Sequence, residues 1–191
     1  EYIDNGMLFK DGDANWDLNK ARKGQNAMGI SVIEVQKRGE GWQVVRPSSF
    51  ARRITVNTPM QLTGPARHQP LMKTAADPQG EQVLGTMQNC ANGHTPWGTY
   101  LTCEENWSDI FVKKADRNAL EKRYGIADSD DSYRWNEVDE RFSVDKTPNE
   151  PNRFGWVVEI DPYDPNSTPR KHTALGRFKH EATMVTLAAD N

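Results

Sequence analysis

The stretch NCANGHTPWGTYLTCEEN, residues 89–106, gathers most of the reactive side chains that this sequence offers. It holds both cysteines of the chain, one of its four histidines and the adjacent carboxylates Glu104 and Glu105. Adjacent carboxylates repel each other and pack poorly in a core, so the pattern is favourable where a positive charge lies against it. A bound metal ion is the obvious candidate for that charge.

The second half of this stretch predicts a β-strand. In residues 99–103 the side chains of Leu101 and Cys103 share one face, because successive residues of a strand point to opposite sides. Glu104 and Glu105 follow at the strand end, where the backbone turns and both carboxylates can converge on one site. Such a pair suits a hard cation such as calcium. A solvated strand end is an equally good interpretation from these residues alone.

Cys90 lies in a segment, residues 89–93, whose Asn and Gly content predicts a loop. A cysteine without a ligand prefers the core, so a loop cysteine is unusual. It can be a thiolate ligand or a nucleophile, or it can form a disulfide with Cys103, and the residues do not choose between these. His94 gives a Cys-x3-His spacing without the further partners of a zinc signature. A polar loop histidine is the simpler interpretation of it.

Two further places carry candidate side chains. Glu181 follows Lys179-His180 and opens the predicted strand 182–187, where a ligand projects from a scaffold. The pair Arg52-Arg53 has the charge to clamp an anion. For Glu181 a solvated surface position is the simpler interpretation, whereas for Arg52-Arg53 a solvated edge is an equally good one.

Composition limits the classes of function. The chain has 191 residues and a net charge of -3, so no strong field draws nucleic acid or an anionic membrane to it. No apolar run is long enough for membrane insertion. Two cysteines set no disulfide framework. The apolar content of 36% and the mean hydropathy of -0.84 are low for a self-contained globular domain.

Strand signals dominate the chain and predict an all-β fold. Residues 12–24 are polar and predict a loop. The predicted strands are short and separated by Gly and Pro turns, as in sandwiches, barrels and propellers. They are residues 29–36 and 42–46, which form a hairpin around 37–41, and residues 99–103, 154–160, 172–175 and 182–187.

One region departs from this pattern. Residues 112–124 have helical composition, and residues 128–150 are polar and acidic, so residues 106–150 are interpreted as a charged, partly helical insertion on a β scaffold. Strand-turn-strand units with long connections fit a partial β-propeller, although no repeat of fixed period is visible. The strand 182–187 and the turn-like Asp190-Asn191 resemble half a hairpin. We therefore expect residues 1–191 to be part of a single propeller domain truncated at its C-terminus.

Taken together, these segments resemble PhoX-type alkaline phosphatases. The long motif of residues 89–106 is the most specific part of the resemblance, which covers nearly the whole chain. The other segments follow in the family's order, and residues 112–150 match least certainly. They are DNGMLF at residues 4–9, GISVIEV at 29–35, RRITVNTPM at 52–60 and GRFKHEAT at 176–183.

The resemblance implies a β-propeller whose central channel holds a cluster of calcium and ferric iron, and an enzyme that hydrolyses phosphate monoesters. Motif by motif, it implies that Cys90 is an iron-binding thiolate and that Glu105, together with Glu104, supplies carboxylate ligands. Glu181 becomes a further ligand on the calcium side. This assignment favours a free Cys90 and leaves Cys103 as a buried strand thiol. Thr95 and Trp97 are expected to pack or position the motif.

The resemblance also implies export by the twin-arginine route and a periplasmic or extracellular location. The phosphate-contacting arginine and further carboxylates are expected beyond residue 191, so we expect the isolated chain to have little activity. Two alternatives remain: a non-catalytic propeller that binds a partner and has lost the metals, and a cysteine hydrolase using Cys90 and His94. The second leaves Glu104 and Glu105 without a role.

Overall fold

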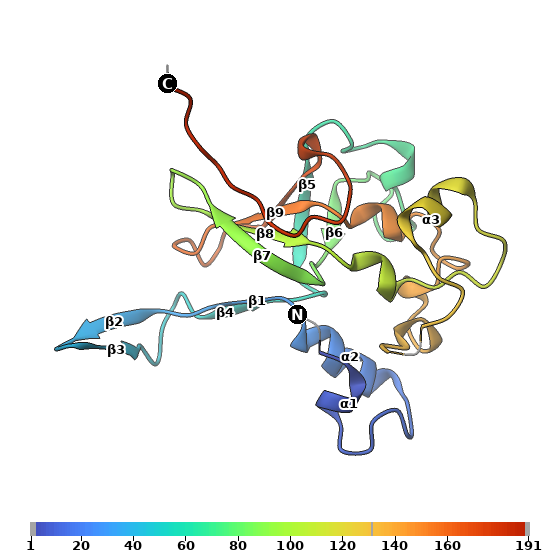
Figure 1. The fold of residues 1–191 in the computed structure, drawn as a ribbon, viewed down its shortest axis with the longest axis horizontal. Coiled ribbons are helices and arrows are strands. Elements are labelled where there is room, and N and C mark those ends of the chain that lie inside the picture. The colour runs from blue at the N-terminus through green and yellow to red at the C-terminus, as the bar shows by residue number, and fades with distance from the viewer. Residues whose placement is uncertain (1–2, 131, 190–191) are drawn as a thin grey trace.

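The computed structural model describes residues 3–130 and 132–189, which fold around one mixed β-sheet (Figure 1). Six strands form this central sheet in the order β6-β5-β10-β9-β8-β7. Neighbouring strands are antiparallel except β10 and β5, which run parallel. The strands are β5 (Pro59–Thr63), β6 (Gln82–Leu84), β7 (Asn89–His94), β8 (Tyr100–Glu104), β9 (Val157–Ile160) and β10 (Arg170–His172).

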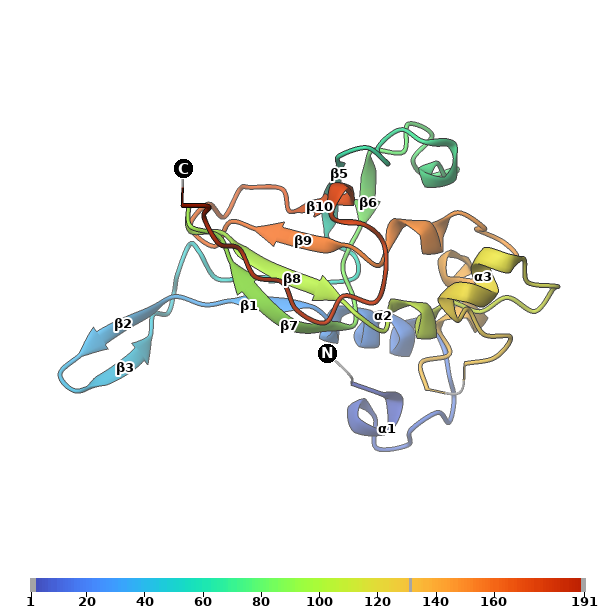
Figure 2. The same cartoon turned by 45° about the horizontal axis from the view of Figure 1, so that its top comes forward.

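Two smaller sheets precede the central one. Strand β1 (Ile30–Val32) pairs with β4 (Arg52–Ile54), and β2 (Val35–Arg38) pairs with β3 (Gly41–Val44), both antiparallel. The hairpin of β2 and β3 projects away from the central sheet in both views (Figure 2). The hairpin predicted around residues 37–41 is therefore confirmed.

The expectation of a loop at residues 12–24 is wrong in its second half. The short helix α1 (Asn5–Leu8) is followed by the ten-residue helix α2 (Leu18–Ala27). Asp17 starts α2, because its side chain accepts a hydrogen bond of 2.8 Å from the amide of Lys20. The sequence did not predict this helix because its composition is polar. Few of its side chains are buried, so it has no clear apolar face.

Residues 106–150 contain the predicted helical segment in a shorter form, α3 (Ala119–Tyr124). Asn118 and Glu121 form a capping box at its start, and Gly125 ends it in the left-handed conformation. None of the helices in the described ranges is both long and apolar enough to cross a lipid bilayer. The 3-10 helices of the chain are Pro70–Met72, Trp107–Ile110, Trp135–Glu137, Glu140–Phe142, Glu150–Arg153 and Thr173–Leu175.

The main hydrophobic core lies between the central sheet and residues 106–150. We call this side of the sheet the core face. Aromatic rings of the 106–150 segment help to fill it: the ring centroids of Trp135 and Phe142 are 5.0 Å apart, and that of Phe111 is 5.5 Å from the ring of Phe154, just before β9. The same cluster includes Val158 of β9. Residues 106–150 thus form no second core but share that of the sheet.

The opposite side of the sheet, the strap face, carries a small cluster of Leu101, Cys103 and Val157. Val185 packs against this cluster from the end of the chain. Residues 177–189, which we call the strap, cross β8 and β7 without joining the sheet (Figures 1 and 2). The strand expected at residues 182–187 is therefore wrong. The turn expected at Asp190-Asn191 lies outside the described residues.

The all-β prediction is confirmed at the level of class, since strands dominate and helices are few. In residues 3–130 and 132–189 the three sheets do not close into a ring of blades. The partial β-propeller, and the status of residues 106–150 as an insertion within it, remain interpretations that concern a longer chain.

The backbone at Gly85 lies very close to the backbone at Val56, and a substitution tests this close approach. Its φ is +75°, and a Cβ built there would lie 1.9 Å from the carbonyl oxygen of Val56, so the backbone has to move for any side chain. We expect Gly85→Ala to lower the free energy of unfolding by more than about 3 kcal/mol in urea titrations followed by tryptophan fluorescence. Gly39, with φ +60° and open space around it, is the control.

For Gly39→Ala we expect a loss of only about 1 kcal/mol, because the new Cβ disfavours the left-handed conformation of this residue but meets no other atom. Equal losses for the two variants would contradict the close approach at Gly85.

Candidate functional site

The motif of residues 89–106 folds into the hairpin of β7 and β8. Strand β7 pairs with β8 from Asn89 opposite Glu104 to His94 opposite Tyr100, with a register shift between Asn89 and Asn92. The expected loop at residues 89–93 is thus a bulged edge strand, because pairing with β8 satisfies its backbone. The bulge contains Cys90. Such bulges commonly redirect a side chain near a functional site.

The turn of this hairpin is closed by its own side chains. The hydroxyl of Thr95 accepts a hydrogen bond of 3.0 Å from the amide of Thr99, and the two hydroxyls are 2.7 Å apart. The indole nitrogen of Trp97 donates to Glu159 at 3.0 Å, while the ring stays 66% exposed. Thr95 and Trp97 hold the turn in the way that positioning residues do.

The two cysteines are both free thiols, so the disulfide alternative is not realised. Cys103 is fully buried on the strap face. Burial raises the pKa of its thiol to about 11, with smaller contributions from the charges of Glu104 and Cys90. Cys90 is partly exposed. Only Cys90 has the access that a ligand or a nucleophile requires.

Glu104 is fully buried on the core face and forms an ion pair with Lys171, which is also fully buried. The two side chains are joined by a hydrogen bond of 2.7 Å. The other carboxylate oxygen accepts hydrogen bonds from the amides of Gly155 at 2.9 Å and Trp156 at 3.1 Å. Burial lowers the pKa of Lys171 to about 8, while the charge and the hydrogen bond of Glu104 act in the opposite direction. Both oxygens of Glu104 are therefore engaged within the protein.

Glu105 follows directly but lies in a different environment. Strand β8 ends at Glu104, and the amide of Glu105 donates a hydrogen bond of 3.0 Å to the carbonyl of Gln88. Its side chain is partly buried. The expectation that both carboxylates converge is not met, because the alternation of the strand carries Glu104 into the core, where Lys171 holds it.

The strap brings Glu181 to the end of β8. The amide of His180 donates a hydrogen bond of 3.1 Å to the carbonyl of Glu104, so Glu181 and Glu105 each lie one residue beyond this bond. Gly93 of β7 permits the close approach, since a Cβ there would lie 2.0 Å from the carbonyl oxygen of Thr183. Segments 76 residues apart in sequence thus meet at one point.

The start of the strap is anchored by Arg177. Its guanidinium donates hydrogen bonds of 2.8 Å to the carbonyl of Phe154 and 2.7 Å to that of Pro151. The same group lies 4.2 Å from the ring centroid of Trp107. Burial lowers the pKa of Arg177 to about 10. This arginine is therefore a structural clamp for the strap.

The other sequence candidates are placed elsewhere. His94 is exposed, four residues along β7 from Cys90, which corresponds to on the order of 10 Å of strand and not to a hydrogen bond. Arg53 is bound to Ser31 at 2.6 Å and to the carbonyl of Ala27 at 2.7 Å. Arg52 donates to the carbonyl of Phe50 at 3.1 Å. The cysteine hydrolase and the anion clamp both lack support in this geometry.

Within residues 3–130 and 132–189, no three His, Cys, Asp or Glu side chains are grouped closely enough to hold a metal ion. The donor types nevertheless fit the expected cluster. Cys90 offers a soft thiolate, while Glu105 and Glu181 offer hard oxygens from the end of β8 and from the strap.

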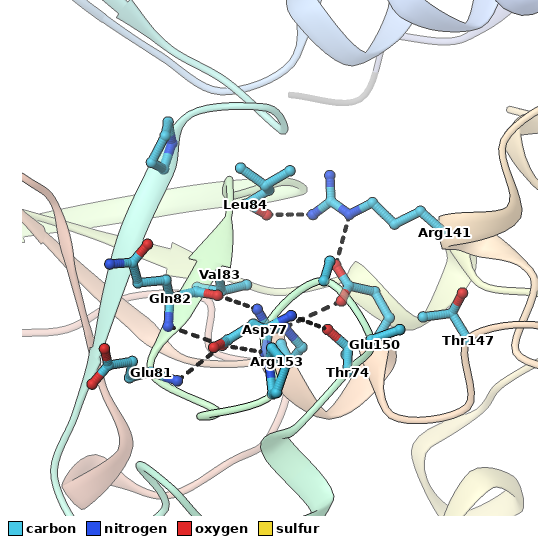
Figure 3. A pocket seen from close by; sticks show the side chains of 14 residues that line it. Thr74, Asp77, Glu81, Gln82, Val83, Leu84, Arg141, Thr147, Glu150 and Arg153 are labelled. Atoms are coloured by element: carbon cyan, nitrogen blue, oxygen red, sulfur yellow. Dashed lines mark hydrogen bonds and ion pairs between the residues drawn. The ribbon is translucent and has the colours of Figure 1, made fainter.

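A cavity of about 660 Å³ lies away from this motif (Figure 3). Two arginines cross it: Arg153 binds Asp77 at 2.9 Å, and Arg141 binds Glu150 at 2.6 Å. Arg153 also donates to the carbonyls of Met72 and Gln82, and Arg141 to those of Val56 and Leu84. Both arginines are thus bonded within the protein. They connect the segment of residues 70–84 to residues 135–153 and have a structural role.

Sequence reasoning missed Lys171 and Arg153, although both are almost completely buried. A buried lysine gives no signal of its own, because the surrounding residues Arg170 and His172 are polar as on a surface strand. Alternation puts Glu104 on the face opposite Leu101 and Cys103, and nothing in the sequence marks that face as the main core.

A family model and a solved structure each match the whole chain, and both are described as PhoX. The family model described as alkaline phosphatase PhoX matches residues 1–191. The solved structure of Pseudomonas fluorescens PhoX in complex with vanadate, a transition state analogue, is 49% identical with a TM-score of 0.96. The alignment covers 100% of this chain and 33% of that chain, so the chain spans about a third of its neighbour's length. A comparison with curated proteins found no match.

The environments of the two thiols predict different reactivity. We expect iodoacetamide at pH 8 to modify Cys90 and leave Cys103 unmodified in chelator-treated native protein, because Cys103 is buried and its pKa is about 11. Peptide mapping by mass spectrometry measures the two sites separately, and urea-unfolded protein provides the control in which both react. Rapid native modification of Cys103, or no reaction at either site before reduction, would contradict this assignment.

Proposed function

This chain belongs to the PhoX alkaline phosphatase family, and we propose that the full-length protein is a metal-dependent phosphatase that hydrolyses phosphate monoesters. The observation that carries the proposal is the match of the entire chain, at 49% identity, to a structure in complex with vanadate, a transition state analogue. Phosphate monoesters are among the slowest substrates to hydrolyse unaided, so strong electrostatic stabilisation is required.

We assign the metals to calcium and ferric iron, as the family resemblance implies, with Cys90, Glu105 and Glu181 as ligands supplied by this chain. Cys90 is the partly exposed thiol of an edge-strand bulge, and it has to be deprotonated to bind iron. The backbone hydrogen bond between His180 and Glu104 lies one residue before Glu181 and one residue before Glu105. When bound, such cations neutralise phosphoryl oxygens and polarise the attacking oxygen.

The remaining parts of the proposal concern the full-length protein. Further carboxylates and a phosphate-contacting arginine are expected outside residues 1–191, as the family resemblance implies. The location is proposed to be periplasmic or extracellular, reached by twin-arginine export. The rest of a β-propeller would close the sheet around the cluster.

The metal assignment predicts a difference between the two cysteines. In the full-length protein we expect Cys90→Ser to lose most of its bound iron and at least about 100-fold in turnover of p-nitrophenyl phosphate. Elemental analysis and a colorimetric assay measure the two quantities. Cys103→Ala, which removes a buried thiol on the strap face, is the matched control and should keep its iron.

Undiminished iron in Cys90→Ser would remove Cys90 from the ligand set. Absence of iron from the unmodified full-length protein would favour the alternative of a non-catalytic binding module. The isolated chain of residues 1–191, assayed with added calcium and iron, should show little turnover.

A further inference from the structure

We infer that Glu104 is a positioning residue and not a metal ligand, and that Lys171 is its partner in holding Glu105 and Glu181 at the cluster. This inference deepens the proposed function and rests on it. The pair is closed, with 2.7 Å between Nζ of Lys171 and Oε1 of Glu104, and both side chains have an exposed fraction of 0%.

The hydrogen bonds of Glu104 leave no oxygen directed toward the strap face. Oε1 is held by Lys171, and Oε2 accepts the amide protons of Gly155 and Trp156. Those two amides lie just before β9, so a single carboxylate ties the ends of β8 and β9 to each other and to β10. A metal ion could bind the carboxylate of Glu104 only if its hydrogen bonds to Lys171, Gly155 and Trp156 in the core were broken.

Lys171 is itself fixed from three sides. Besides Glu104, its ammonium group donates a hydrogen bond of 3.0 Å to the carbonyl of Arg153 and lies 3.8 Å from the ring centroid of Phe154. Among the described residues with a charge, Arg141 and Glu150 also act on it electrostatically. The lysine is therefore a rigid point in the core, to which the end of β8 is attached.

Backbone hydrogen bonds of Glu104 and its neighbour fix the chain next to both proposed ligands, Glu105 and Glu181. Its carbonyl accepts the amide proton of His180 at 3.1 Å, which fixes the strap one residue before Glu181. Its own amide donates to the carbonyl of Trp156 at 3.3 Å, and the next amide, that of Glu105, donates to Gln88 at 3.0 Å. A shift of Glu104 would displace Glu105 and Glu181 together.

Three variants of the full-length protein separate a positioning role from a ligand role: Glu104→Gln, Lys171→Met and the double variant. Each single change leaves one buried charge without its partner, so we expect both to lose at least about 10-fold in metal occupancy and activity. The double variant removes both charges, and its glutamine oxygen can still accept the amide protons of Gly155 and Trp156.

We expect the double variant to recover at least half of the wild-type iron and calcium, together with the visible absorption of a ferric thiolate at Cys90. Lys113→Met is the matched control, since it breaks the ion pair with Glu121, 2.9 Å away, in the 106–150 segment and should leave metal content unchanged. Circular dichroism melting establishes that each protein measured is folded.

A folded double variant that stays as poor in metal as Glu104→Gln would overturn the inference, because a missing ligand is not restored by removing Lys171. Wild-type metal content in Lys171→Met would overturn it as well. If the singles do not fold, the double variant alone still decides between the two roles. Absence of metal from the wild-type protein would instead contradict the proposed function itself.

Discussion

The buried ion pair of Glu104 and Lys171 is the interaction on which the candidate site depends. Both side chains are fully enclosed, and breaking such a pair from one side costs about 3–5 kcal/mol, because the remaining charge stays buried without a partner. The pair is tolerated because both charged groups have further partners: two amides bind the carboxylate, and a carbonyl and an aromatic ring bind the ammonium group. A carboxylate with so many partners acts as a fixed point where three strands meet.

From this point the strand alternation separates the two carboxylates of the motif. Glu104 enters the core face, while Cys103 lies on the strap face and Glu105 follows past the end of the strand. The strap then reaches the same place from the far end of the chain and binds the backbone of Glu104. The two adjacent glutamates therefore have different roles in this account: Glu104 holds the scaffold, and Glu105 is the proposed ligand of the cluster.

The sequence allowed the strand class, the hairpin at residues 37–41 and the strand β8 to be predicted, because alternation and turn residues are local signals. It misjudged α2, whose few buried side chains leave no clear periodicity. It also misjudged the strap, whose apolar residues resemble a strand although only Val185 packs against the cluster of Leu101 and Cys103 among the described residues. The roles of Glu104 and Lys171 were out of reach, because a buried charge pair depends on a partner 67 residues away. The candidate residues came from the family resemblance, and only the structure separated Glu104 from Glu105.

The central claim is that Cys90, Glu105 and Glu181 face the metals while Glu104 stays on Lys171. Anomalous diffraction at the iron edge from crystals of the full-length protein tests it most directly. The account predicts an iron peak bonded to the Sγ of Cys90, carboxylate oxygens of Glu105 and Glu181 at the cluster, and an intact ion pair between Glu104 and Lys171. An iron peak coordinated by Glu104, or none beside Cys90, would contradict it.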